Sequence, residues 1–187
     1  MKKCIFIDRD GTINIEKNYL HKIEEFEFIK NSEKAIKIFK ELGYLVIVIT
    51  NQSGIARGYY SENDVKILHE YINKILKERY DIEIDDFYYC PHHIKGEIKE
   101  YAIECKCRKP EPELFIKAKE KYNIDFLNSY MIGDKLSDLE GAIKLGIEPV
   151  FVRTGHGKIE EEKIYFNVKK YNDIYVFAKE LKNKLNK

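Results

Sequence analysis

Two aspartates, Asp8 and Asp10, follow a short apolar run at residues 4–7, with a single residue between them. Four apolar residues that stop at charged ones are typical of a strand buried on both faces, and Gly11 allows the chain to turn directly afterwards. In an open α/β sheet, ligands bind in the crevice beyond the carboxyl ends of the strands. Two carboxylates this close repel each other unless a cation lies between them, and an oxygen-only ligand set favours Mg²⁺. The pattern therefore predicts a magnesium site, with a turn carrying two solvated acids as the alternative.

A second group of metal-ligating residues pairs Cys90 with His92 and Cys105 with Cys107, and twelve residues separate the two pairs. Three thiolates and one imidazole form a closed tetrahedral set for structural Zn²⁺, which leaves no position for a reactive water. We expect His92 rather than His93 as the fourth ligand because its spacing from Cys90 mirrors that of the other pair. The alternative is a loop with free thiols. A redox pair is disfavoured because the C-x-x-C spacing is absent.

The elements that would position these residues alternate between strands and helices. After residues 4–7, we expect strands at residues 44–50, 87–89, 130–134 and 150–152. The apolar periodicity predicts helices at residues 32–42, from residue 61 to beyond residue 76, and at 111–122, 137–145 and 173–185. Ser32 is expected to cap the first helix, and Ser61 with Asp64 matches a capping box for the second. This alternation predicts right-handed crossovers and a mostly parallel sheet with helices on both faces.

Composition and charge limit the partners. The chain of 187 residues suits one domain, and a formal charge of +1 argues against a dedicated nucleic-acid binder. It contains no apolar run long enough to span a membrane, and its N-terminus enters a strand instead of a signal peptide. We therefore expect a cytoplasmic, monomeric protein without a membrane or nucleic-acid partner.

Four motifs in strand ends and loops resemble those of the haloacid dehalogenase (HAD) superfamily of aspartate-nucleophile phosphatases. They are residues 8–12, residues 50–51, residues 108–110, and residues 133–134 with Asp138 shortly after. The closer similarity is to the subgroup of D-glycero-D-manno-heptose 1,7-bisphosphate 7-phosphatases and histidinol-phosphatases, whose zinc loop also uses C-x-H and C-x-C. The runs at residues 50–58 and 130–135 favour the heptose enzymes, with histidinol phosphate as the alternative substrate.

The resemblance implies an α/β fold with a doubly wound, mostly parallel sheet and a zinc-binding loop at about residues 90–107. The chain has no spare stretch long enough for a full cap domain, so we expect an open site walled by the zinc loop and residues 15–21. Such a site suits a small phosphorylated sugar. The implied activity is Mg²⁺-dependent hydrolysis of a phosphate monoester in the synthesis of lipopolysaccharide precursors.

The resemblance also assigns catalytic roles. It makes Asp8 the nucleophile that becomes an aspartyl phosphate, and Asp10 the general acid and then base. Thr50 and Lys109 would bind the oxygens of the transferred phosphate. Asp8 and Asp134 would ligate Mg²⁺ through carboxylates and Asp10 through its backbone carbonyl. We expect Asp138 to orient Lys109 or the metal shell.

The resemblance also implies which residues contact the part of the substrate that is not transferred. These residues are Asn51, Gln52, Ser53 and Arg108. Arg108 could pair with a second phosphate group of the substrate. The segment at residues 16–19, with Tyr19, is expected to contribute. Lys135 is either a substrate contact or a solvated neighbour of Asp134.

Two other protein classes remain as alternatives. A phospho-receiver signalling module also uses an aspartyl phosphate, a threonine and a lysine, but it needs neither the acid at Asp10 nor a zinc loop. A zinc-dependent nucleic-acid module is disfavoured by the balanced charge and by the lack of an aromatic and basic stripe.

Overall fold

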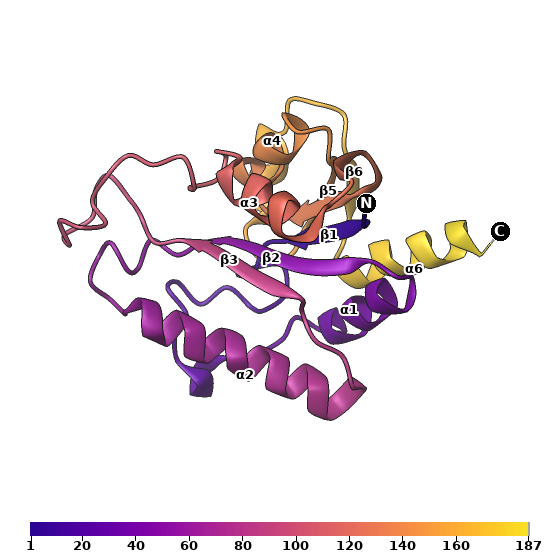
Figure 1. Cartoon of the computed structure of the whole chain (residues 1–187), viewed down its shortest axis with the longest axis horizontal. Coiled ribbons are helices and arrows are strands. Elements are labelled where there is room, and N and C mark those ends of the chain that lie inside the picture. The colour runs from indigo at the N-terminus through magenta and orange to yellow at the C-terminus, as the bar shows by residue number, and fades with distance from the viewer. Residues whose placement is uncertain (187) are drawn as a thin grey trace.

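A six-stranded parallel sheet organises the molecule, of which the computed structural model describes residues 1–186. The strand order is β3-β2-β1-β4-β5-β6. From the central β1 the chain winds outward through β2 and β3, and it then returns to β4 and winds the other way through β5 and β6 (Figure 1). The direction of winding therefore reverses between β1 and β4, where doubly wound sheets bind their ligands.

The strands are β1 (Cys4–Ile7), β2 (Leu45–Asn51), β3 (Asp86–Cys90), β4 (Tyr130–Gly133), β5 (Glu148–Val152) and β6 (Lys169–Tyr171). The α-helices are α1 (Ser32–Glu41), α2 (Glu62–Tyr80), α3 (Glu113–Tyr122), α4 (Leu136–Ile143), α5 (Gly157–Glu160) and α6 (Ile174–Leu185). Short 3₁₀ helices in the connections are η1 (Ile23–Glu25), η2 (Phe126–Asn128) and η3 (Glu161–Lys163).

Strand β1 is the most enclosed element of the sheet. All four of its side chains are fully buried, as expected of a strand covered on both faces. Phe6 pairs in register with Ile47 of β2 on one side and with Met131 of β4 on the other. Just beyond β1, the backbone N–H of Asp8 donates to the carbonyl of Ile132 at 2.9 Å, so the sheet still holds the chain where its first carboxylate appears.

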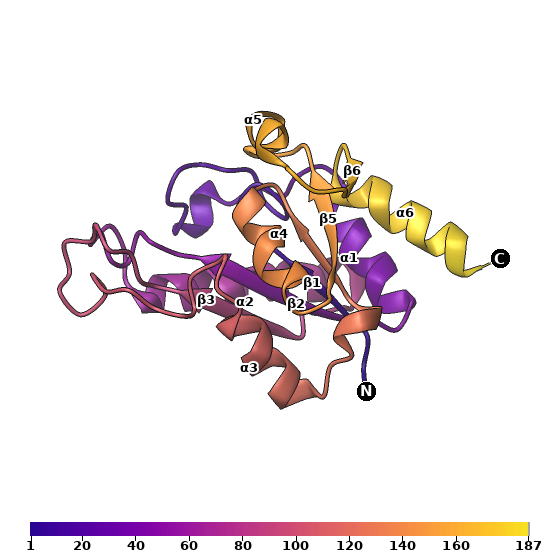
Figure 2. The ribbon, with the colours of Figure 1, turned by 90° about the horizontal axis from the view of Figure 1, so that it is seen from above.

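Helices cover both faces of the sheet, as Figures 1 and 2 show. Helices α1, α2 and α6 pack on one face, where Phe39, Leu68 and Phe177 belong to the same core cluster as Ile5. Helices α3 and α4 pack on the other, where Phe115 joins the cluster that contains Phe6. Successive side chains of β1 thus enter opposite cores, and the predicted doubly wound α/β fold is confirmed.

Several local expectations are confirmed. Ser61 and Asp64 form the predicted capping box at the start of α2, with the Asp64 N–H donating to Ser61 Oγ. Gly43 has a φ of +77° directly after the end of α1, a conformation that glycine adopts without strain. The remaining predicted helices and strands are present, with ends shifted by up to two residues.

Other expectations are wrong. Ser32 does not cap α1: Asn31 is the N-cap, and Ser32 is the first helical residue, whose Oγ donates instead to the carbonyl of Ile13 at 2.8 Å. The sheet also has a sixth strand, β6, which was not predicted because two of its three residues are exposed lysines and only Tyr171 is buried. The short helix α5 was also not predicted.

The connections leave the carboxyl edge of the sheet open. In the part of the chain that the structure describes, the segments after β1 and β3 are loops with little regular structure, and no cap domain is inserted there. Across residues 1–186, no helix combines the length and the apolar character needed to cross a bilayer.

Candidate active site

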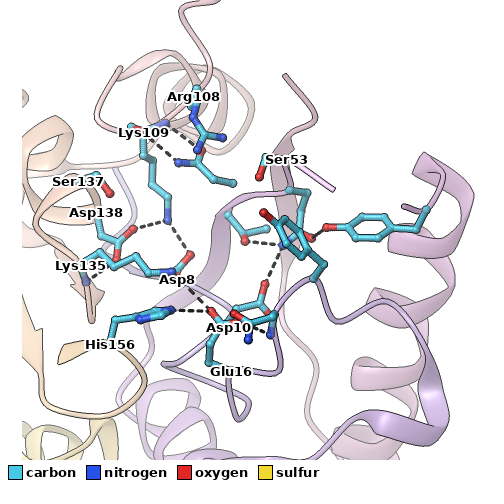
Figure 3. A pocket seen from close by; sticks show the side chains of 16 residues that line it. Asp8, Asp10, Glu16, Ser53, Arg108, Lys109, Lys135, Ser137, Asp138 and His156 are labelled. Carbon is cyan, nitrogen blue, oxygen red and sulfur yellow. Dashed lines mark hydrogen bonds and ion pairs between the residues drawn. The ribbon is translucent and has the colours of Figure 1, made fainter. Parts of the chain in front are cut away.

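A cavity of about 260 Å³ lies beyond the carboxyl ends of β1, β2 and β4 (Figure 3). Its lining includes Asp8, Asp10, Tyr19, Thr50, Asn51, Gln52, Ser53, Arg108, Lys109, Lys135 and Asp138. The structure therefore brings together every residue for which a catalytic or substrate-binding role is expected. Glu16 and Asn18, from the expected segment at residues 16–19, also line it, and the structure adds Tyr60, Ser137 and His156.

Lys109 lies between two carboxylates at the base of this cavity. Its Nζ is 2.7 Å from Asp8 Oδ1 and 2.7 Å from Asp138 Oδ1, and it also donates to the carbonyl of Ile49 at 2.6 Å (Figure 3). Burial alone would lower the pKa of Lys109, but Asp138 and Asp8 outweigh burial and raise it. Lys109 therefore stays charged, and Asp138 orients it as expected.

Asp8, Asp134 and Asp138 form a buried cluster of carboxylates. One oxygen from each lies within 4.8 Å of the others. Burial and Asp138 raise the pKa of Asp8 to about 6, and burial, Asp138 and Asp8 raise that of Asp134 to about 8. Asp134 Oδ1 has no hydrogen-bond partner among the described residues. Because an oxygen-only donor set, excess negative charge and an orphaned carboxylate oxygen suit a hard divalent cation, this cluster fits Mg²⁺.

The backbone is shaped to admit Asp134 into this cluster. Gly11 has a φ of +85°, and a methyl group added at Gly11 or Gly155 would overlap Asp134 Oδ2. That same oxygen accepts a hydrogen bond from the backbone N–H of His156 at 2.7 Å. Two glycines and one backbone donor thus fix where the Asp134 carboxylate lies.

Asp10 lies beside this cluster but has its own counter-charge. Its carboxylate accepts hydrogen bonds from Arg9 Nη2 at 2.8 Å, Gln52 Nε2 at 2.9 Å and Asn14 Nδ2 at 3.0 Å. Burial alone would raise the pKa of Asp10, but Arg9, Asn14 and Gln52 together lower it. A cation was expected between the two aspartates. For the Asp10 side chain, that cation is the buried guanidinium of Arg9.

The side chain of Asn51 holds the backbone of Lys109 through two hydrogen bonds. The Asn51 amide accepts from the backbone N–H of Lys109 at 3.0 Å and donates to its carbonyl at 3.1 Å. Asn51 therefore holds the loop that carries Lys109 against the end of β2. Arg108 has a weaker tether, a bond of 3.3 Å from Nη1 to the carbonyl of His92.

Cys90, His92, Cys105 and Cys107 converge just before this loop, with one ligand atom from each within 4.8 Å of the others. Cys90 Sγ is 3.5 Å from Cys105 Sγ and 3.0 Å from Cys107 Sγ, and His92 Nδ1 is 3.2 Å from Cys107 Sγ. These separations exceed a disulfide bond and approach the ~3.8 Å edge of a tetrahedral zinc site. The four residues fit Zn²⁺.

The neighbouring histidine is not part of the cluster. His93 Nδ1 accepts a hydrogen bond from the backbone N–H of Lys95 at 3.1 Å, so its ring is used within its own turn. The choice of His92 over His93, made from spacing alone, agrees with this placement.

Comparisons with known proteins place the chain among phosphatases. The family model for HAD-hydrolase-like proteins matches residues 106–174. A D-glycero-beta-D-manno-heptose-1,7-bisphosphate 7-phosphatase from Haemophilus ducreyi is 48% identical over 155 residues, which are 82% of this chain and 85% of the relative. The corresponding alpha-heptose enzyme of Photorhabdus laumondii is 46% identical over 82% of this chain and 84% of its own.

The chain belongs to the HAD-like phosphatase family.

A solved structure agrees with this placement. The D,D-heptose 1,7-bisphosphate phosphatase of B. bronchiseptica, complexed with magnesium and phosphate, superposes with a TM-score of 0.86 at 27% identity. The match covers 97% of this chain and 99% of that one. The phosphatase described here is therefore a phosphoric monoester hydrolase, and the signalling and nucleic-acid alternatives are set aside.

Three residues of this HAD-like phosphatase site, Arg9, Tyr60 and His156, were not predicted, whereas Glu16 belongs to the segment at residues 16–19 that was expected to contribute. Glu16 Oε2 is 3.4 Å from His156 Nε2 and 3.5 Å from Lys135 Nζ (Figure 3). Arg9 Nη2 and Tyr60 Oη donate to Gln52 Oε1 at 3.2 and 2.7 Å. Arg9 stands inside the first motif, and its place between two aspartates was the available signal. His156 follows β5 at the end of another strand, and the same edge rule could have found it.

Proposed function

We propose that this phosphatase removes the 7-phosphate from D-glycero-D-manno-heptose 1,7-bisphosphate through an aspartyl phosphate at Asp8, as a step toward lipopolysaccharide precursors. The substrate assignment rests on the name shared by relatives that are 44–48% identical over four-fifths of the chain. The geometry of Asp8, Lys109 and Asp10 supports the chemistry.

Asp8 is the nucleophile. Its Oδ1 is bonded to Lys109, which leaves Oδ2 to attack the phosphorus atom, and the bond from phosphorus to the sugar oxygen breaks as the new bond forms. Lys109 and Thr50 bind the oxygens of the transferring phosphate, whose charge must be stabilised during transfer.

Asp10 acts as the general acid in the first step and as the general base in the second. A bound phosphate adds negative charge beside Asp10, and this raises its pKa and favours the protonated form that protonates the leaving sugar oxygen. In the second step the resulting carboxylate accepts a proton from the water that hydrolyses the aspartyl phosphate. Gln52 and Asn14 hold this carboxylate toward the cavity.

The metal site belongs to Asp8, Asp134 and the backbone carbonyl of Asp10. When bound there, Mg²⁺ supplies positive charge that lets an anionic nucleophile approach an anionic phosphate. Asp138 is committed to Lys109 at 2.7 Å and orients it. The zinc cluster has no open position and serves structure only.

The remainder of the substrate extends toward the mouth of the cavity. Arg108 lies at the side of the cavity away from Asp8 (Figure 3), where its guanidinium can pair with a second phosphate. Ser53, Tyr19 and Lys135 also line the cavity, where they can contact the sugar. Asn51 and Gln52 act here through Lys109 and Asp10, although both also line the cavity.

The test is release of phosphate from heptose 1,7-bisphosphate with Mg²⁺, with both anomers supplied and histidinol phosphate as the competitor. We expect wild type to prefer the bisphosphate in kcat/KM and Asp8→Asn to lose turnover by at least about 10⁴-fold, as removal of a nucleophile does. Tenfold or greater preference for histidinol phosphate would overturn the substrate assignment. Full turnover by Asp8→Asn would overturn the aspartyl phosphate.

A further inference from the structure

Helix α2 carries a buried histidine that does not line the catalytic cavity. His69 is 5% exposed, and its ring stacks on Phe87 of β3 with centroids 4.3 Å apart. A histidine in this position could simply fill the space between α2 and the sheet. Its second contact argues for more.

That second contact is with the arginine that neutralises Asp10. His69 Nε2 is 3.3 Å from Arg9 Nη1. Because a guanidinium has only donors, Nε2 must be the acceptor, and the imidazole is neutral. Burial and the charge of Arg9 lower the pKa of His69 well below its ordinary value, which agrees with this assignment.

The other nitrogens of Arg9 are directed elsewhere. Nε donates to Asp10 Oδ1 at 3.2 Å, and Nη2 donates to Asp10 Oδ2 at 2.8 Å. Nη2 is also bonded to the carbonyl of Leu20 at 3.0 Å and to Gln52 Oε1 at 3.2 Å. Among residues 1–186, His69 is the one hydrogen-bond partner of Nη1. Arg9 is fully buried, so water does not replace that partner.

We propose that His69 is a positioning residue for the acid–base step: by accepting from Nη1, it turns the Nε–Nη2 edge of the planar Arg9 guanidinium onto the carboxylate of Asp10. The guanidinium is rigid, so a bond at one corner fixes where the opposite edge points. Without that bond Arg9 tilts, and Asp10 leaves the orientation from which it protonates the leaving oxygen. This role rests on the proposed function of Asp10.

The leaving group provides the test. A sugar alkoxide must be protonated as it departs, whereas an aryl oxide such as p-nitrophenolate leaves unassisted. Because kcat/KM reports the steps up to formation of the aspartyl phosphate, poor positioning of the acid lowers it for the sugar phosphate and spares the aryl phosphate. A purely structural loss lowers both alike.

We expect His69→Leu to lower kcat/KM for the sugar phosphate about tenfold relative to the aryl phosphate, a part of the roughly 10²–10⁴-fold that a positioned acid contributes. His69→Gln, which can return an acceptor near the Nε2 position, should restore most of the ratio. Phe87→Leu is the matched control: it removes the ring stack but keeps the acceptor, and should leave the ratio unchanged. If His69→Leu does not fold by circular dichroism, His69→Asn replaces it, because its shorter amide places no acceptor at the Nε2 position.

Equal losses on both substrates, no rescue by His69→Gln, or the same ratio change in Phe87→Leu would each overturn the role of His69. Failure of the proposed function has a different signature. In that case wild type would release no phosphate from either substrate, or Asp10→Asn would show no selective loss on the sugar phosphate.

Discussion

The charge on Lys109 is the residue-scale feature on which the site depends. Its ammonium joins Asp8 to Asp138, and the side chain is only 1% exposed. The cation that lies between these two carboxylates compensates for part of the cost of burying them. The ammonium that we propose binds the phosphate therefore also opposes the rise in the pKa of Asp8, the proposed nucleophile.

Lys109→Gln should accordingly remove both activity and stability. Removing one partner of a buried ion pair leaves an uncompensated charge, so we expect a loss of about 3–5 kcal/mol in the free energy of unfolding. Lys135→Gln is the matched control, because the Lys135 side chain is 34% exposed and its loss should cost less. Urea unfolding of the three proteins measures the difference, and equal destabilisation by both substitutions would contradict this account.

The raised pKa of Asp134 predicts how the stability of the protein depends on pH. Burial, Asp138 and Asp8 raise its pKa from 3.8 to about 8, so in metal-free protein the native state holds a proton that the unfolded state releases. The contribution of Asp134 to stability is therefore present below pH ~4 and is lost as the pH rises through about 8. In chelator, Asp134→Asn should unfold at a higher temperature than wild type at about pH 9, with the difference shrinking toward about pH 5.

Thermal unfolding with added Mg²⁺ completes that experiment. The cation should stabilise wild type at alkaline pH and leave Asp134→Asn nearly unchanged, because the variant lacks one of the carboxylates that hold it. A metal-free wild type more stable than the variant at about pH 9 would rule out the buried charge as the cause.

At the scale of elements, the zinc loop continues directly into Arg108 and Lys109, but these two residues are anchored differently. Lys109 is held by Asn51 at its backbone and by Asp8 and Asp138 at its side chain. The Arg108 carbonyl accepts from the backbone N–H of Glu111 at 2.8 Å, but among the described residues its side chain has one hydrogen bond, to the carbonyl of His92. Loss of zinc should therefore disturb Arg108 more than Lys109.

Verified zinc-free protein should show this difference in its kinetics. We expect KM for the bisphosphate to rise about tenfold, which corresponds to about 1.4 kcal/mol of lost binding, while kcat on a small aryl phosphate changes less than about twofold. Cys105→Ser provides the same comparison without a chelator that could also bind Mg²⁺. Unchanged KM in zinc-free protein would disprove the coupling between the loops.

The sequence predicted most of these elements because their signals are local. Strands β1, β2 and β4 are apolar runs that end in polar residues, and the helices carry regular apolar faces. Strand β6 could not be predicted, since its lysines offer no apolar pattern and it forms through pairing with β5. Ser32 was assigned as a cap because its local context permits it, but its hydroxyl bonds to the distant Ile13.

The same distinction separates the predicted and unpredicted parts of the site. Asp8, Asp134 and the zinc ligands stand in short motifs and could be located in advance. The contacts of Arg9 with His69 and of Glu16 with His156 join residues far apart in the chain or of common surface types. No local spacing marks such pairs, so only the folded chain reveals them.

At the scale of the molecule, selectivity must come from loops on an open edge, because no cap domain closes over the described site. Arg108, a half-buried cation in the cavity lining, is the residue that we propose pairs with a second phosphate. Arg108→Ala should lower kcat/KM for the bisphosphate about tenfold or more and affect a monophosphate little, since a charged hydrogen bond contributes about 1.5–3 kcal/mol. Lys106→Ala removes the same charge from the same loop, outside the cavity lining, and is the control. Equal effects of the two substitutions would assign the selectivity to general attraction instead of pairing.

The parallel sheet also determines where the two ends of the chain lie. Every strand points its carboxyl end toward the cavity, so the residues before β1 and the end of α6 lie on the opposite side, away from the zinc loop (Figures 1 and 2). A tether attached at either end would leave the mouth of the cavity facing solvent. The enzyme can therefore be immobilised on a surface, or fused to a second enzyme that consumes its product, without obstructing the entry of substrate.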